Sequence, residues 1–384
     1  MTAYRSPWMT EELDMLSVAA RRFFQEEIAV HQERFNTQGY VDREVWNKAG
    51  EMGLLCASIP EVYGGGGGDF SHEAVLNIEM TRALASFGLG VHSGIVAHYI
   101  LAYGSEEQKQ RWLPRMASGE LVAAIAMSEP GAGSDLKSIK TRAVRVEDHY
   151  VINGAKTFIT NGYHANLICV VAKTDPDPTA GSRGVSLIMV ETDNQPGFRR
   201  GRILDKIGQK GQDTTELSFD DVRAPVTHLL GGEEGRGFYQ LMQQLPQERL
   251  IIALSAQASM HKAIELTVEY VQNRLVFGKP LADMQNTRFK LAECKTEATI
   301  ATRFVDQCMM QLLKGELDST TAAMAKWWTT QKNCEIIDEC LQLHGGYGYI
   351  LEYPIARMYV NARVSKIYGG SNEIMKELVA RSIL

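Results

Sequence analysis

Three glycine-rich segments of this chain could bring backbone amides close to a bound ligand. The first, AIAMSEPGAGSD (124–135), places Gly131 to Ser134 in a tight turn, because glycine lets the backbone fold back sharply. The other two, HGGYGY (344–349) and YGGSNE (368–373), lie among helical patterns, where glycines also end helices. The G-x-G-x-x-G spacing of a dinucleotide site fails, since position 136 is leucine. On spacing alone, each segment is either a ligand-binding turn or an ordinary turn.

The composition is that of a folded protein that is not built to bind nucleic acid. Of the 384 residues, 45% are hydrophobic and 22% are charged, which is enough to bury large cores. The net charge is -6 and no long block of like charge occurs, which disfavours an electrostatic nucleic-acid binder. The apolar stretch 88–104 is interrupted by His92, Ser93 and His98, so no membrane span is expected.

Neither the cysteines nor the N-terminus carries a specific signal. The cysteines show no C-x-x-C spacing, so we predict no metal site and expect reduced thiols in the core, at positions 56, 169, 294, 308, 334 and 340. The N-terminal sequence lacks the apolar stretch of a secretion signal and the Arg-rich bias of a transit peptide. A cytoplasmic protein, or one that is already processed, is therefore expected.

The first part of the chain, residues 1–121, has the periodicity of helices. Apolar residues recur at spacings of three and four, and Ser105 followed by Gln108 predicts a capping box at a helix start. The five glycines 64–68 interrupt this pattern and predict a mobile connection, with a ligand-binding loop as the alternative. We therefore expect an N-terminal α-helical domain.

Residues 122–232 have the pattern of an antiparallel β domain. β-branched and aromatic runs are punctuated by Asn153-Gly154 and Asn161-Gly162, dipeptides typical of tight hairpins. Helices do not alternate with these runs, which disfavours a parallel nucleotide-binding sheet.

Residues 233–384 return to helical periodicity and predict a C-terminal helical bundle. Helices are expected over 286–314, 318–345 and 354–384, with a break at Gly369-Gly370. The uncharged run 250–260 suits a helix that is covered on nearly every side. The fold class is therefore α+β multidomain, in the order helical, β, helical.

Five motifs in fixed order resemble those of the acyl-CoA dehydrogenase family, over nearly the whole chain: EPGAGSD, TFITNG, RLVFGKPLADMQ, LQLHGGYGY and RVSKIYGGSNEIMKELVAR. The resemblance implies an N-terminal helical domain, a β-barrel-like middle domain and a C-terminal four-helix bundle. It also implies an FAD cofactor, an acyl-CoA substrate, a role in fatty acid β-oxidation and a homotetramer built as a dimer of dimers. Electrons would leave to an electron-transfer flavoprotein.

The resemblance also assigns contacts with FAD. The flavin ring would face Met127, Ser128, Phe158, Ile159 and Thr160. Gly133 would also bind the cofactor, and Ser134 would contact both the cofactor and the CoA arm. The Ser128 and Thr160 hydroxyls would donate to the ring and stabilise its reduced form. Arg274, Phe277 and Gln285 would reach the FAD of a neighbouring subunit. Gln342, Gly345 and Gly346 would lie on the opposite side of that shared site. Ser371 would lie near the diphosphate of the cofactor.

The catalytic base must differ from that of many relatives. These carry Tyr-Glu-Gly where this chain has Tyr368-Gly369-Gly370, so the usual carboxylate is absent. Isovaleryl-CoA and long-chain acyl-CoA dehydrogenases place it within an E-R-L element on an earlier helix, which makes Glu248 in LPQERLIIA (245–253) the candidate base. The uncharged residues that follow could raise the pKa of its carboxyl toward working pH. The amide of Gly369 would hold the thioester oxygen, and Ser134, Arg249, Tyr368 and Gly370 would complete the substrate contacts.

The motifs look most like those of long-chain enzymes, so we expect α,β-dehydrogenation of medium to long acyl-CoAs, including branched ones, to trans-2-enoyl-CoA. Glycines at 369 and 370 should leave room near the thioester. An enzyme for isovaleryl-CoA or citronellyl-CoA is a related alternative. Flavin oxidases and monooxygenases share the fold and are a second alternative. A non-catalytic flavin- or CoA-binding subunit is a third, disfavoured because Glu248 is present.

Overall fold

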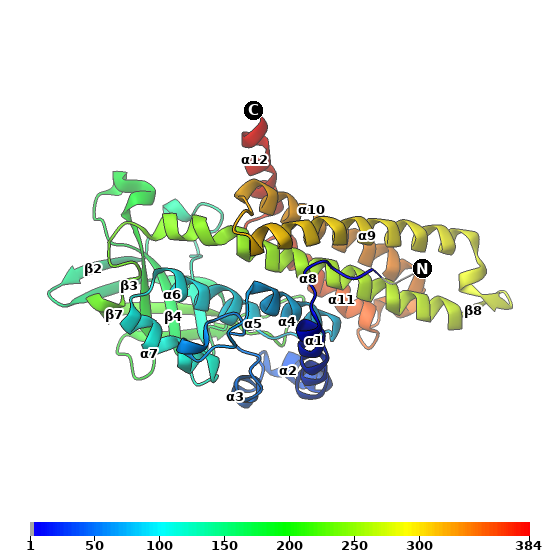
Figure 1. The fold of residues 1–384 in the computed structure, drawn as a ribbon, viewed down its shortest axis with the longest axis horizontal. Helices are drawn as coiled ribbons and strands as arrows, with labels where there is room; N and C mark the ends of the chain where they lie inside the picture. Colours follow the sequence, from blue (N-terminus) through cyan, green and yellow to red (C-terminus); the bar gives the residue numbers. More distant parts are fainter. Residues whose placement is uncertain (1–3) are drawn as a thin grey trace.

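The structure is a computed structural model that describes residues 4–384. A β domain lies at one end of the molecule, and the long helices of the C-terminal part run from it to the other end (Figure 1). The shorter N-terminal helices pack along one side of both. The predicted order of a helical part, a β part and a second helical part is confirmed.

The N-terminal part is helical, as predicted, with two π-helical turns at Phe24–Ile28 and His92–Val96. The Ser105 hydroxyl accepts from the Gln108 amide at 3.2 Å and the Gln108 side chain accepts from the Ser105 amide at 2.9 Å, which confirms the capping box. The helices are α1 (Glu11–Phe23), α2 (Gln32–Gln38), α3 (Arg43–Glu51), α4 (Phe70–Arg82), α5 (Leu89–Val91), α6 (Ala97–Tyr103) and α7 (Glu106–Ala117).

The five glycines 64–68 do not form the loose connection that the sequence suggested. Each of their amides donates to a backbone carbonyl of residues 56–61. A Cβ on Gly65 would overlap the carbonyl of Ile59, and a Cβ on Gly66 would lie 2.7 Å from that of Ala57. The glycines therefore allow close backbone packing rather than motion.

The middle part is a curled seven-stranded sheet in the order β1-β4-β2-β3-β7-β6, with β5 paired to β4. Most pairs are antiparallel, but β4 runs parallel to both β1 and β2, so the expectation of an antiparallel domain is wrong at these two pairings. Parallel strands cannot be joined by a tight hairpin, because the chain must return to the same end of the sheet. The chain between β1 and β4 makes this return and includes the β2–β3 hairpin. The strands are β1 (Ala123–Ala126), β2 (Arg142–Val146), β3 (His149–Thr160), β4 (Leu167–Lys173), β5 (Val185–Glu191), β6 (Phe198–Ile203) and β7 (Thr214–Pro225).

The two Asn-Gly dipeptides do not make hairpins. Gly154 lies inside β3 at a shift of register, where a Cβ would collide with Thr141 of the adjoining segment. Asn161-Gly162 turns the chain from β3 toward β4, which are not paired, and Asn161 has a φ of +65°. The β2–β3 hairpin turns at Glu147 instead, with a φ of +53°. Glycine at position 154 therefore serves close packing rather than a turn.

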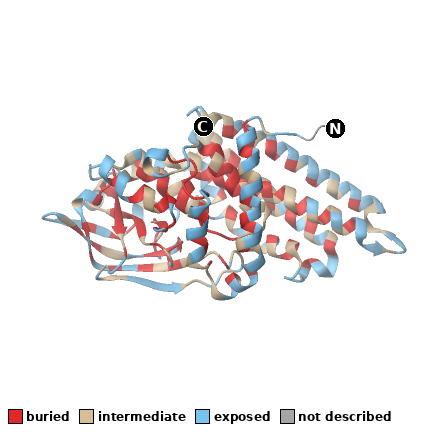
Figure 2. Ribbon diagram, turned by 60° about the horizontal axis from the view of Figure 1, so that its bottom comes forward, coloured by how far each residue is buried: buried red, intermediate tan, exposed pale blue. Residues whose placement is uncertain are grey.

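The C-terminal part consists of long helices and one short hairpin at the far end of the molecule. The elements are α8 (Gly237–Asn273), β8 (Leu275–Val276), β9 (Lys279–Pro280), α9 (Gln285–Leu313), α10 (Ser319–His344), α11 (Pro354–Ala362) and α12 (Asn372–Ile383). Leu250, Ile251 and Leu254 of α8 pack in one core with residues of α1, α4, α9 and α10. Buried residues follow the inner helices and the inner face of the sheet (Figure 2). Thus α8 is the central helix, covered as its uncharged sequence predicted.

Candidate active site

Glu248 lies on the central helix α8 with only 6% of its surface exposed. The Tyr99 hydroxyl, from α6, donates a hydrogen bond of 2.7 Å to Glu248 Oε1. Burial raises the pKa of Glu248 to about 7, while the Tyr99 bond and the charge of Arg249 act in the opposite direction. A carboxyl with this pKa can accept a proton near neutral pH, as a general base must.

Glu73 on α4 is a second buried carboxyl whose pKa is raised to about 7 by burial. It differs in its surroundings, because its Oε1 accepts from the amide and the hydroxyl of Ser58 at 3.3 and 3.2 Å. Glu73 is also fully buried, and the partner of these hydrogen bonds, Ser58, is not part of the 368–371 loop. A raised pKa alone therefore does not select Glu248; its neighbourhood does.

The loop with Gly369 and Gly370 faces the same side of α8 as Glu248. A Cβ on Gly369 would overlap Ile252 Cδ1, so Ile252 touches this loop. Ile252 follows Glu248 by four positions, which places both side chains on one helix face about one turn apart. The structure therefore brings Glu248 and Gly369 to one place.

The same contact corrects one expectation about the substrate space. Glycine at 369 was expected to leave room near the thioester, but Ile252 Cδ1 fills the position that a Cβ would take. Gly369 and Gly370 have φ angles of +64° and +87°, which also favours glycine. Both glycines are thus required by the path of the loop.

Two buried basic side chains, Lys326 and Arg249, lie near this loop. Lys326 Nζ, on α10, donates to the Gly370 carbonyl at 2.6 Å and to Asn372 Oδ1 at 3.1 Å. Burial, together with the nearby charge of Arg249, lowers the pKa of Lys326 to about 7. Arg249 donates to Ser319 Oγ at 3.0 Å, and its Nε has no hydrogen-bond partner among residues 4–384. Lys326 therefore anchors the loop, and Arg249 retains one buried donor near Glu248.

The segments expected to face the flavin ring lie side by side, since the Thr157 amide donates to the Ser128 carbonyl at 3.0 Å. Phe158 has a φ of +60° and is 69% exposed, and Thr160 is half-buried. Ile159 departs from the expectation, because its side chain is buried in the core of the β domain. Strand alternation explains this, since neighbouring side chains point to opposite faces. Ile159 can therefore face a ligand with its backbone but not with its side chain.

The EPGAGSD turn is closed by reciprocal backbone bonds between Glu129 and Ala132, of 2.8 and 3.1 Å. A Cβ on Gly131 or Gly133 would meet nothing within 4 Å, and Ser134 is exposed. These glycines border open space, unlike those at 369 and 370. This open side is where a ligand could approach the backbone amides closely.

Two further groups of expected cofactor residues lie around the β8–β9 hairpin and the end of α10, at the opposite end of the molecule from the β domain (Figure 1): the Arg274 group (Arg274, Phe277 and Gln285) and the Gln342 group (Gln342, Gly345 and Gly346). Arg274 lies over the Tyr347 ring of the same chain, 5.7 Å from its centre. Within one chain, the Arg274 group and the Gln342 group therefore lie close together at the same end of the molecule. The exposed members are Arg274, Phe277, Gln285, Gln342, Gly345 and Gly346. Ser371 lies apart from them, as the N-cap of α12 beside the Gly370 loop.

These residues fit FAD by their chemistry. The β domain offers hydroxyl donors at Ser128 and Thr160 beside an exposed aromatic ring, Phe158. The far end offers the Arg274 guanidinium, which suits a diphosphate, beside Phe277, which is 98% exposed. Exposed aromatic rings beside polar donors are typical of surfaces that a ligand or a second chain covers.

Sequence reasoning missed Tyr99, Ile252 and Lys326. Tyr99 meets Glu248 across 149 positions of sequence, and no spacing signals such a contact. Ile252 is apolar within an apolar run and gives no signal of its own. Lys326 did give one, since a single lysine within AAMAKWW is unusual unless its charge has a buried partner.

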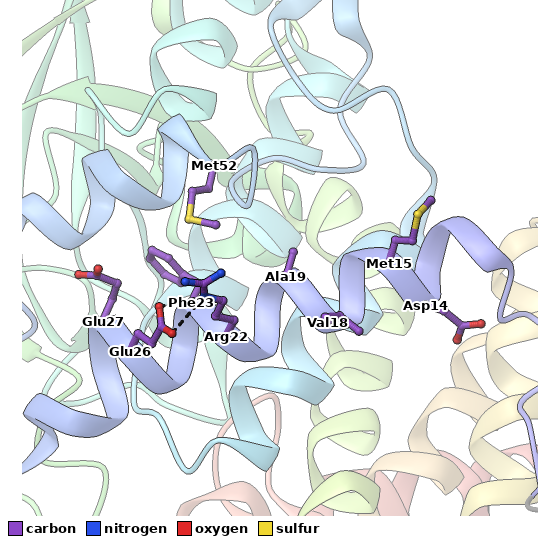
Figure 3. A pocket seen from close by; sticks show the side chains of 9 residues that line it. All are labelled: Asp14, Met15, Val18, Ala19, Arg22, Phe23, Glu26, Glu27 and Met52. Carbon is purple, nitrogen blue, oxygen red and sulfur yellow. Dashed lines mark hydrogen bonds and ion pairs between the residues drawn. The ribbon is translucent and has the colours of Figure 1, made fainter.

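The main hollow of the surface lies away from Glu248. A hollow of about 710 Å³ runs along α1 between Met15 and Met52, and Glu248 does not line it (Figure 3). Within residues 4–384, no group of three or more His, Cys, Asp or Glu side chains could hold a metal ion. In the same range, no helix has the length and apolar character to cross a bilayer.

Three family models match the chain in order. They describe the acyl-CoA dehydrogenase N-terminal domain over residues 10–120, the middle domain over 124–222 and the C-terminal domain over 235–384. The chain therefore belongs to the acyl-CoA dehydrogenase family, whose members are FAD-dependent oxidoreductases.

Individual relatives are similar over almost the full chain. The mouse mitochondrial long-chain specific acyl-CoA dehydrogenase is 47% identical over 98% of this chain and 87% of its own length. The rice mitochondrial isovaleryl-CoA dehydrogenase is 35% identical over 95% of this chain and 89% of its own length.

Two solved structures bear on the fold and the cofactor. An acyl-CoA dehydrogenase from Geobacillus kaustophilus has a TM-score of 0.96 and 47% identity, and covers 99% of this chain and 100% of its own. A glutaryl-CoA dehydrogenase from Mycobacterium smegmatis, solved in complex with FADH2, has a TM-score of 0.90 and 27% identity, and covers 98% of this chain and 95% of its own.

Proposed function

We propose that this protein removes hydrogen from the α and β carbons of a medium- to long-chain acyl-CoA, including branched chains, with Glu248 as the general base. The observation that carries this proposal is the buried Glu248 carboxyl, with its pKa raised to about 7, on the helix face that touches the Gly369 loop. The loop itself has no carboxylate, so Glu248 takes the role that a glutamate at 369 has in other family members.

The residues divide the reaction between them. Glu248 accepts the α proton of the thioester, while Tyr99 holds Oε1 and keeps the carboxylate oriented. The amide of Gly369 donates to the thioester oxygen, and Lys326 fixes the loop that carries this amide. FAD, when bound, accepts the hydride that leaves the β carbon. Loss of the proton and the hydride leaves trans-2-enoyl-CoA.

The substrate class rests on the relatives and on the site. Higher identity to the long-chain enzyme, at 47%, than to the isovaleryl-CoA enzyme, at 35%, supports a long acyl chain. The isovaleryl-CoA relative keeps a branched-chain enzyme, for isovaleryl-CoA or citronellyl-CoA, as the second candidate. An electron-transfer flavoprotein is the proposed acceptor, and fatty acid oxidation the proposed pathway.

The FAD site needs a second copy of the chain. Residues for the flavin ring lie in the β domain, whereas Arg274 and its neighbours lie at the opposite end of the molecule (Figure 1). One cofactor can contact both groups only if the second group comes from another subunit. This supports a dimer with two shared FAD sites, within a homotetramer built as a dimer of dimers.

A panel of acyl-CoAs tests this function. Straight chains from butyryl-CoA to palmitoyl-CoA, together with isovaleryl-CoA and citronellyl-CoA, are mixed anaerobically with the protein, and bleaching of the flavin is followed. Fastest reduction by long chains supports the proposal, and fastest reduction by isovaleryl-CoA or citronellyl-CoA supports the second candidate. If butyryl-CoA alone reduces the flavin, the substrate assignment is wrong. Rapid reoxidation by O₂ would indicate an oxidase.

A further inference from the structure

Glu129 and Lys156 form a buried ion pair beneath the two segments assigned to the flavin ring. Lys156 Nζ donates to Glu129 Oε1 at 2.9 Å, and the two residues are 1% and 8% exposed. Buried lysine and glutamate are rare unless they are paired, because each charge loses its hydration. Apolar residues of similar size would often give equal or greater stability, so the pair is poor grounds for a purely stabilising role.

The pair connects both segments directly. Lys156 Nζ also donates to the Met127 carbonyl at 2.9 Å, at the end of β1. The Glu129 carboxylate accepts from the amides of Lys140 and Thr141 at 2.6 and 2.9 Å, ahead of β2. Lys156 itself belongs to β3. One ion pair therefore ties the EPGAGSD turn, the start of β2 and the flavin-facing end of β3 together.

The backbone next to the pair is irregular. The register of β3 against β7 shifts between Lys156 and Ile159, and Phe158 within this shift has a φ of +60°. A non-glycine residue held in this region costs about 1–3 kcal/mol, so neighbouring contacts must hold it there. Lys156 is the residue at which this shift begins, and its ammonium is held by Glu129 and the Met127 carbonyl. The ion pair therefore fixes the strand next to Phe158 and can set the outward position of the Phe158 side chain.

We propose that the Glu129–Lys156 pair positions the Met127-Ser128 segment against the Phe158-Thr160 segment, and so sets how tightly the protein holds the flavin ring. Both are positioning residues, since they act through the segments that they hold. The inference rests on the proposed assignment of these segments to the flavin.

Charge removal on either side of the pair tests this role in the holoenzyme. The variants are Lys156→Met, Glu129→Gln and the double variant, which leaves no unpaired buried charge. Arg199→Met is the matched control, because Arg199 and Asp220 form an exposed ion pair at 3.6 Å on strands β6 and β7 of the same sheet. FAD release on serial dilution is followed by flavin fluorescence, with the thermal midpoint and the visible spectrum of the bound flavin.

The double variant separates positioning from stability. We expect it to regain thermal stability relative to either single variant, yet to bind FAD about ten- to hundredfold more weakly than the wild type and with an altered flavin spectrum. Arg199→Met should change neither. A folded double variant with unchanged FAD affinity and spectrum overturns the inference. A wild-type protein that takes up no FAD contradicts the proposed function instead. If Lys156→Met does not fold, the double variant carries the same comparison.

Discussion

Replacing Gly369 by alanine tests whether Ile252 closes the space beside the 368–371 loop. The new Cβ would overlap Ile252 Cδ1, while Ile252 Cγ1 lies 3.8 Å away. Overpacking of this kind costs about 1–3 kcal/mol. The φ of +64° adds about 1–2 kcal/mol for a residue that has a Cβ. We therefore expect Gly369→Ala to lower the free energy of unfolding by about 2–5 kcal/mol.

Shortening Ile252 separates the steric cost from the backbone cost. Ile252→Val removes Cδ1, so in that background Gly369→Ala should cost only the backbone share, about 1–2 kcal/mol. Gly370→Ala is the matched control, because its Cβ would lie 2.6 Å from Cε of Met375, the movable end of a flexible side chain. Denaturant unfolding of the holoenzymes measures the costs. An equal cost of Gly369→Ala in both backgrounds would refute the steric contact.

The same contact governs relocation of the base. A chain with Glu248→Gly and Gly369→Glu places the carboxylate where other relatives have it, but its side chain must pass Ile252. We expect flavin reduction to recover in part only when Ile252→Val is added. Recovery without that change would contradict the position of Ile252.

The buried groups and the exposed far end give three further measurable outcomes. The pKa of Glu248 is raised from 4.5 to about 7 on folding, so the contribution of this carboxyl to stability is fully present below pH 4.5 and about 3 kcal/mol of it is lost as the pH rises from 4.5 through 7. In denaturant titrations at pH 5 and 8, Glu248→Gln should therefore show a smaller fall in stability than the wild type, and the share of Glu73, whose pKa is raised in the same way, should remain; an unchanged fall contradicts the burial of a titrating carboxyl at 248. Tyr99→Phe removes a bond that favours the carboxylate, so the acid limb of the kcat/KM profile should move to higher pH; an unmoved limb argues against the Tyr99 contact. Arg274→Ala should weaken FAD binding about tenfold to hundredfold, measured by flavin fluorescence; unaltered binding contradicts the shared FAD site.

The sequence predicted the order of the parts because helix and strand periodicities differ over long stretches. The family resemblance also pointed to Glu248 as the proposed base, because residue 369 carries no carboxylate. The Ser105–Gln108 cap was predictable because it is set within one turn of chain. Features that depend on a few neighbouring residues were thus accessible.

Predictions failed where distant parts of the chain decide the outcome. Gly154 resembles a hairpin residue, but the approach of Thr141 determines its role. The run 64–68 resembles a flexible linker, but the carbonyls of residues 56–61 hold it. The space at Gly369 depends on Ile252, more than a hundred positions earlier. Such contacts form only when the tertiary structure does.

The rate of flavin reduction in Glu248→Gln tests the central claim most directly. Glutamine keeps the size and hydrogen bonding of the side chain and removes its basicity. Glu73→Gln is the control, because Glu73 is equally buried with its pKa also raised to about 7, but bonds Ser58 rather than Tyr99. In anaerobic stopped-flow experiments with a long-chain acyl-CoA, Glu248→Gln should retain FAD while reduction slows by about 10²–10⁴-fold, and Glu73→Gln should react like the wild type. If the flavin of Glu248→Gln is reduced at the wild-type rate, the assignment of Glu248 as the base is contradicted.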